Sequence, residues 1–182
     1  DLAASLNNLS VHLSDLGRHE AALAAIEEAV AHYRTLAQAR PDAFLPDLAG
    51  SLNNLSNRLS DLGRHEAALA AIEQAVAIRR SLAQARPDAF LPDLAASLGA
   101  RGLILHEADA AAAAASFREG IETLRGPFLA LPQAFASLML ALVRGYIDAC
   151  EATGIAPDNG LLAPIAAMLH RLQTDQPPET PP

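Results

Sequence analysis

The chain has 182 residues, a formal net charge of −8 and no lysine, and 51% of its residues are hydrophobic. The acidic balance argues against a nucleic-acid-binding protein, which needs a basic surface, and against binding to an anionic membrane. The apolar runs are shorter than the roughly 20 residues that a membrane-spanning helix needs. The hydrophobic residues are mostly Ala and Leu, and only 4% of the chain is aromatic, so we expect an all-α protein.

The N-terminal half consists of a sequence that recurs at an interval of 46 residues. Asp1, Asp47 and Asp93 occupy the same point of successive copies, and copies one and two differ at seven positions. These differences are Ala4/Gly50, Val11/Asn57, His12/Arg58, Glu28/Gln74, His32/Ile78, Tyr33/Arg79 and Thr35/Ser81. A period of about 20–50 residues is typical of a solenoid, in which each unit packs only on its neighbours.

Each copy is expected to form two helices. In copy one, leucines spaced three and four residues apart predict a first helix over 2–15 with one apolar stripe. This stripe consists of Leu2, Leu6, Leu9, Leu13 and Leu16. Gly17 should close the helix, and a second helix should run from residue 18 or 19 to Ala39. Copy two repeats the pattern.

Two prolines leave the start of the next helix open. Asp42 could cap a helix that begins at Ala43, or Pro46 could be the first helical residue. We favour a short turn over Pro41–Phe44 followed by a continuous helix.

The third copy begins faithfully at Asp93 and then diverges, with a turn that is one residue shorter. After Gly126-Pro127 the pattern resumes at an offset of 91, and a final helix capped by Asp158 is expected over 159–173. We therefore divide the chain into repeat 1 (1–46), repeat 2 (47–92), a degenerate repeat 3 (93–131), a degenerate repeat or capping helices (132–173) and a disordered proline-rich tail (174–182).

A helix, a tight turn with Gly, a second helix with small–large–small spacing and then Pro resembles the tetratricopeptide repeat. The residues that carry the resemblance are Leu6, Leu9, Ser10, Leu13, Gly17, Ala22, Ile26 and Ala29, with the same residue types 46 positions later. The usual unit has about 34 residues; the longer unit and the Leu-Asn-Asn-Leu of the first helix resemble the kinesin-light-chain-like branch.

This resemblance implies a right-handed superhelical solenoid of antiparallel helix pairs, here about three and a half repeats. It also implies that the first helix of each pair lines a concave face that binds peptides or protein segments. Abundant Ala without Lys is typical of a high-GC bacterial genome, and such arrays are often parts of larger bacterial regulatory or effector proteins. Asp1 opens directly into the repeat and Cys150 is the lone cysteine, so we expect a cytoplasmic fragment of such a protein.

The resemblance places a set of mostly polar side chains on the concave face. The expected binding residues are Asn7, Asn8, Val11, Ser14, Asp15, Asn53, Asn54, Asn57, Ser60, Asp61, Leu103 and His106. Because Asn is both donor and acceptor, a ladder of Asn could hold the backbone of an extended peptide. Alternatively, Asn7 and Asn53, or Asn8 and Asn54, bond each other and hold the repeats in register. An acidic rim of Asp15, Asp61 and Glu107 favours a neutral or basic ligand.

No spacing in the sequence predicts a metal site, a cofactor site or catalysis. His19, His65 and His106 each precede Glu, but no second His follows at the spacing of a zinc-protease motif. Cys150 aligns with Leu59 and is expected to be a small core residue. We expect a non-enzymatic protein with no metal or cofactor.

Two non-enzymatic functions remain open. The first is an interaction module that holds a protein or peptide segment in the groove. The second is a spacer or a self-association module, since the apolar residues of the C-terminal half are too numerous to bury on one stripe. They are Phe128, Leu129, Leu131, Phe135, Leu138, Met139, Leu140, Leu142, Val143 and Tyr146. For packing, Ile72 is expected to fill the joint between repeats and Arg79 is expected to be exposed.

Overall fold

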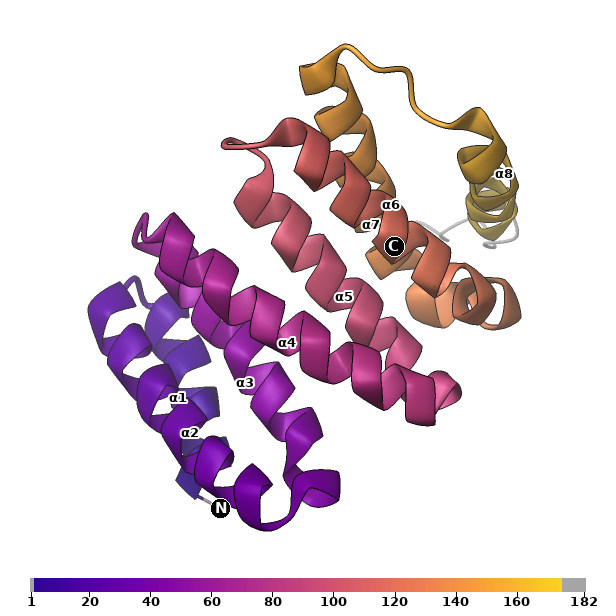
Figure 1. Cartoon of the computed structure of the whole chain (residues 1–182). Coiled ribbons are helices and arrows are strands. Elements are labelled where there is room, and N and C mark those ends of the chain that lie inside the picture. The colour runs from indigo at the N-terminus through magenta and orange to yellow at the C-terminus, as the bar shows by residue number, and fades with distance from the viewer. Residues whose placement is uncertain (1, 175–182) are drawn as a thin grey trace, which may run out of the picture.

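The computed structural model of the chain describes residues 2–174, which form eight helices and no strand (Figure 1). They are α1 (Leu2–Asp15), α2 (His19–Ala39), α3 (Pro41–Asp61), α4 (His65–Ala85), α5 (Pro87–Leu105), α6 (Ala110–Ala130), α7 (Pro132–Thr153) and α8 (Asn159–Thr174). Each helix packs on the next one along the chain, so the predicted all-α array of helix pairs is confirmed. The predicted disordered tail lies outside the described residues, except that Thr174 is the last residue of α8.

Left-handed glycines end the first helix of three pairs. Gly17, Gly63 and Gly154 have φ angles of 71°, 70° and 70°, a conformation that glycine adopts at least steric cost. In the first two of these turns, the N–H of the residue after the glycine donates to a carbonyl of the helix that ends there, at 2.8 Å. The third copy has no such glycine, and Asp109 instead caps α6 by accepting the N–H of Ala112 at 2.9 Å.

The favoured turn over Pro41–Phe44 is wrong, because α3 begins at Pro41 itself. A single extended residue, Arg40 with φ −144°, separates α2 from α3, as a residue before proline prefers. Proline suits the first helical position because its ring presets φ and its missing N–H has no partner there anyway. Pro46 lies inside α3 and costs one backbone hydrogen bond without ending the helix. The alternatives, a cap at Asp42 or a start at Pro46, are therefore also wrong.

The near-identity of copies one and two makes α3 a reference for the burial of α1. Leu2 is 58% exposed, whereas its equivalent in copy two, Leu48, is 7% exposed. The difference arises because α2 packs on α3 from the N-terminal side, and no described helix covers α1 in this way. The predicted stripe of α1 is thus only partly buried. Leu6 and Leu13 are half-buried, Leu9 and Leu16 are exposed, and Ala3 and Ser10 are the buried residues.

A phenylalanine replaces the joint isoleucine in the third repeat, and glycines make room for it. Ile26 and Ile72 are fully buried, as expected for Ile72, and Phe117 occupies the equivalent place with 2% exposure. A Cβ atom added at Gly102 would lie 2.7 Å from the Phe117 ring, and one at Gly145 would lie 2.5 Å from it. The ring therefore fits between α5 and α7 only because both helices carry glycine there.

The C-terminal helices build a second core. Cys150 is buried, as predicted, and α8 is capped by the Asp158 carboxylate, which accepts the N–H of Leu161 at 3.1 Å. Most of the apolar excess noted in the sequence is absorbed here. Phe128, Met139, Leu142 and Tyr146 are buried, Phe135, Leu138 and Val143 are half-buried, and Leu129, Leu131 and Leu140 are exposed.

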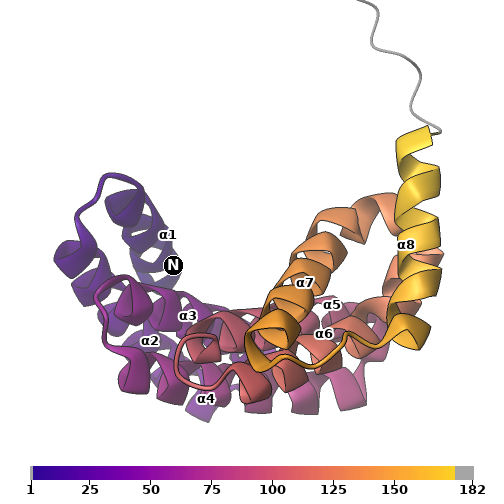
Figure 2. The same cartoon turned by 90° about the horizontal axis from the view of Figure 1, so that it is seen from above.

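The helices form a curved array with α1 on one flank and α7 and α8 on the other (Figure 2). Between the flanks, α3 and α5 lie toward the inner side, and α2, α4 and α6 lie toward the outer side. Successive first helices also contact each other directly, α1 with α3, α3 with α5 and α5 with α7. The inner face is therefore a continuous surface made by the first helix of each pair.

Leu48→Ala should lower the free energy of unfolding by about 2–4 kcal/mol, because it leaves a cavity between α2 and α3. The same change at the equivalent Leu2 should cost less than about 0.5 kcal/mol, because that side chain is already in water. Urea denaturation of the two variants measures both values. A large loss for Leu2→Ala would contradict the exposed face of α1.

Candidate functional site

A polar hollow of about 280 Å³ lies between α1 and α3. The side-chain oxygen of Asn7 accepts hydrogen bonds there from the hydroxyl of Ser51 and the amide of Asn54, each at 3.1 Å. Asn8, which is exposed, lines the same hollow. The Asn7 amide therefore holds the first two repeats together, through a pairing with Asn54 that neither alternative from the sequence had named.

We call the contact between repeats 1 and 2 the first joint and the contact between repeats 2 and 3 the second joint. The second joint has the same asparagine–serine hydrogen bond but a different second donor. The side-chain oxygen of Asn53, the equivalent of Asn7, accepts from the Ser97 hydroxyl at 3.0 Å. Ala100 occupies the position of Asn54 and has no amide to offer. Instead, Nη1 of Arg79 lies 3.5 Å from the same Asn53 oxygen. Each joint thus has one asparagine acceptor, one serine donor and one further donor.

The expectation that Arg79 is exposed is wrong. Its Nη1 donates to the Ser97 hydroxyl at 2.6 Å and to the backbone carbonyl of Asp93 at 2.8 Å, so the side chain crosses from α4 to α5. Burial lowers the pKa of the guanidinium, and the Asp93 carboxylate partly offsets this effect. The half-buried charge is held by hydrogen bonds, as a charge in such a place must be.

A second, apolar hollow of about 260 Å³ lies on the inner face between α3, α5 and α7. Asn57 is its polar residue, and no described residue hydrogen-bonds its side chain. Leu103 stands at the hollow with 69% of its surface exposed. The lining residues are Asn57, Ala96, Gly99, Ala100, Leu103, Phe117, Leu138, Ala141 and Leu142.

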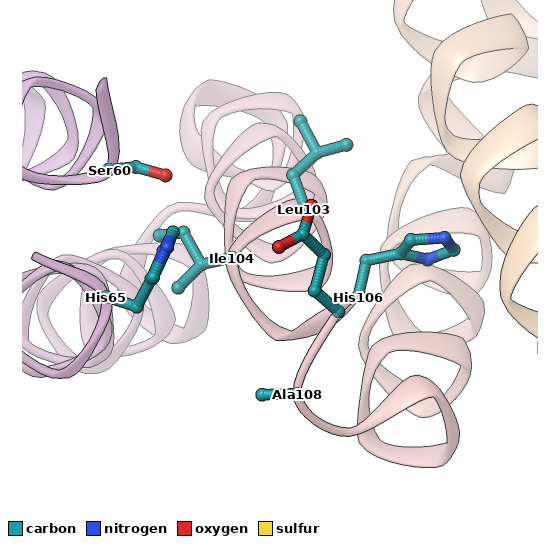
Figure 3. A pocket seen from close by; sticks show the side chains of 7 residues that line it. Ser60, His65, Leu103, Ile104, His106 and Ala108 are labelled. Carbon is teal, nitrogen blue, oxygen red and sulfur yellow. The ribbon is translucent and has the colours of Figure 1, made fainter. Parts of the chain in front are cut away.

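A third hollow, of about 410 Å³, lies at the end of the array where the two helices of each pair are joined by a turn. We call it the turn-edge hollow. Figure 3 shows Ser60 and His65 on one wall facing Ile104 on the other, whereas the ring of His106 points away from them. The lining residues are Ser60, His65, Leu103, Ile104, His106, Glu107 and Ala108.

The remaining expected site residues divide into paired and exposed ones. Ser14 donates to the carboxylate of Asp61 at 3.4 Å, and Nε of Arg58 lies 3.2 Å from the same oxygen. The Asp61 carboxylate is thus paired with a cation, so the rim carries less net negative charge than the sequence indicated. Val11 and Asp15 are exposed on α1 and line none of the three hollows.

Sequence reasoning missed the serine and arginine donors of the joints. The sequence did contain a signal for the serines. Serine recurs at positions 5, 51 and 97, which are spaced by the 46-residue period of the repeat. No such signal existed for Leu138 and Leu142, since α7 belongs to the degenerate part of the chain. Their place at the apolar hollow follows only from the packing of α7 on α5.

Within residues 2–174, no group of three or more His, Cys, Asp or Glu is arranged to hold a metal ion. Over the same range, no helix has the length and apolar character needed to span a membrane. The family model of the tetratricopeptide repeat matches residues 2–40 and 48–87. These two matches lie over the first two helix pairs, which are thus similar to tetratricopeptide repeats within a longer helical-repeat solenoid. No curated protein matches the chain.

Arg79→Ala should cost about 1.5–3 kcal/mol of unfolding free energy, because it removes a charged donor from the second joint and leaves Asn53 and Ser97 with fewer partners. The neighbouring Arg80 is the matched control, since its ion pair with Glu119 is on the exposed outer side and should be worth less than about 1 kcal/mol. Denaturation curves of the two alanine variants give both values. Similar small losses would contradict the role of Arg79 in the joint.

Proposed function

We propose that the chain is a protein-interaction module that holds a segment of a partner protein along its inner face. The observation that carries this proposal is the apolar hollow between α3, α5 and α7, with exposed Leu103 at its edge and, in its wall, the amide of Asn57, which has no hydrogen-bond partner among the described residues. A hollow that is mainly apolar with a few polar groups is typical of a binding site. Tetratricopeptide repeats in general bind protein partners, which supports the same class of function.

The contacts within the stack decide which of the expected residues can serve a ligand. Asn7, Asn53 and Asn54 already bond within the joints. Asn8 and Asn57 keep their amides free of described partners and lie at the polar and the apolar hollow. The binding set in this proposal is therefore Asn8, Asn57, Ser60, Leu103 and His106, each of which lines one of the three hollows, and it leaves out Val11 and Asp15, which line none.

The partner segment in this proposal is extended and neutral or basic. An extended backbone presents donors and acceptors at its edge, and the Asn57 amide matches both kinds. The chain carries a net charge of −8, which disfavours an acidic segment and speeds the approach of a basic one. The proposed setting in a larger bacterial regulatory or effector protein of the cytoplasm, from the kinesin-light-chain-like branch, rests on the composition and the long unit of the sequence.

Self-association is the second candidate function. It is favoured by Leu131, which is 61% exposed and lines a hollow of about 450 Å³ with Leu91 and Phe135. Sedimentation equilibrium over a wide range of concentrations tests it. A chain that stays monomeric throughout excludes this candidate and leaves the groove proposal intact.

Peptides selected on the chain from a random phage-displayed library should bind Leu103→Glu at least about tenfold more weakly, because the substitution puts a charge at the apolar hollow. Leu16→Glu is the matched control: Leu16 is equally exposed, at 74%, but lies in the turn after α1, away from the hollows described above. Its binding should be unchanged. Equal affinity of both variants for every selected peptide would remove the groove as the site.

A further inference from the structure

The turn-edge hollow has an equivalent place one repeat earlier, and the chain fills that place with its own arginine. Arg58 is the residue equivalent to Ile104, and its side chain is only 16% exposed. Nε of Arg58 lies 3.2 Å from Oδ2 of Asp61, and the Ser14 hydroxyl donates to the same oxygen at 3.4 Å. In the first joint, the Asp61 carboxylate thus contacts both a serine hydroxyl and a guanidinium.

The joint between copies two and three has equivalents of the serine and the carboxylate but lacks the guanidinium. Ser60 is the equivalent of Ser14, Glu107 is the equivalent of Asp61, and both line the turn-edge hollow. Ile104 replaces the arginine, and Ala108 replaces the larger Leu62. These two replacements remove side-chain volume on the α5 side, and the hollow of about 410 Å³ lies where that volume was.

The groups left in the hollow are complementary to a cation. Glu107 is exposed and forms no ion pair with any described residue, and the Ser60 hydroxyl has no hydrogen-bond partner among them. The apolar walls, Leu103 and Ile104, suit the methylene stem of a long side chain. His65 lies beside Ser60 on the same wall (Figure 3). Glu107 is the acidic residue of the lining, so its carboxylate is the group that favours a cationic ligand.

We propose that the turn-edge hollow takes an arginine side chain of the bound partner segment, with its guanidinium on Glu107 and Ser60. This inference rests on the proposed function and specifies its ligand. Arginine fits better than lysine because its planar fork can contact a carboxylate and a hydroxyl at the same time. Leu103 lines both this hollow and the apolar one, so one segment can place an apolar residue and an arginine in adjacent sites.

The direct test is a titration of the ¹⁵N-labelled chain with N-acetyl-arginine amide, followed by amide chemical shifts. Saturable shifts are expected at Ser60, Glu107 and Ala108, and the uncharged citrulline analogue should give none. Glu107→Gln should weaken the arginine probe by about tenfold, because it removes the charge partner. Asp15→Asn, at the equivalent position of copy one, is the matched control and should leave the titration unchanged.

Two variants that restore residues of copy two should close the hollow. Ile104→Arg supplies the internal guanidinium of the first joint, and Ala108→Leu supplies the side chain of Leu62. Each should abolish the shifts caused by the probe, and the second remains informative if the first unfolds. Equal shifts from arginine and citrulline, an unchanged titration in Glu107→Gln, or no shifts at all would overturn the proposal.

Peptide selection separates this inference from the proposed function. Peptides that depend on Leu103 should be enriched in arginine on the wild-type chain and lose that enrichment on Glu107→Gln. Peptides that depend on Leu103 without any arginine preference would overturn the arginine site and leave the groove function standing. If no selected peptide depends on Leu103, the groove function fails, and the arginine titration alone decides the site.

Discussion

The close approach of successive helices around one buried side chain per repeat is the constraint on which the structure depends. Ile26 and Ile72 are fully buried. So are the alanines four residues before and three residues after each of them, which are Ala22, Ala29, Ala68 and Ala75. Small neighbours let the helices come near enough to enclose a large residue without voids. Phe117 is enclosed in the same way but is larger, and the missing side chains of Gly102 and Gly145 leave the space for its ring. Because this spacing recurs from joint to joint, the curvature of the array and its inner face follow from it.

The apolar packing sets the distance between neighbouring helices, and the polar side chains form their hydrogen bonds across that distance. At each joint an asparagine oxygen lies between two helices and must find donors, and the two joints find them differently, from Asn54 in one and from Arg79 in the other. Amides used in this way have fewer donors and acceptors left for a ligand. The side chains best placed to bind a ligand are therefore those that take no part in the contacts between repeats, chiefly Asn57, Leu103 and Glu107.

Much of the fold could be predicted from the sequence because helix periodicity and turn chemistry are local. Gly17 marked its turn correctly, but Pro41 and Pro46 satisfy competing local rules that only the tertiary packing decides. The burial of Leu2 depends on a neighbouring helix, which no local pattern reports. The site was harder still. The period places the Cβ of Arg79 on an outer helix, but it does not say that a long side chain reaches across to the next one.

The two kinds of joint also bear on how the copies find their order during folding. Because copies one and two are almost the same, a chain that skips copy two could dock α2 directly on α5, as happens when repeat proteins misassemble. Asn7 would then meet Ser97 and Ala100, with neither Asn54 nor Arg79 to provide the second donor. A missing hydrogen bond of about 1 kcal/mol favours the correct sequence of docking several-fold. The few differences between the copies thus favour the docking of each repeat on its correct neighbour.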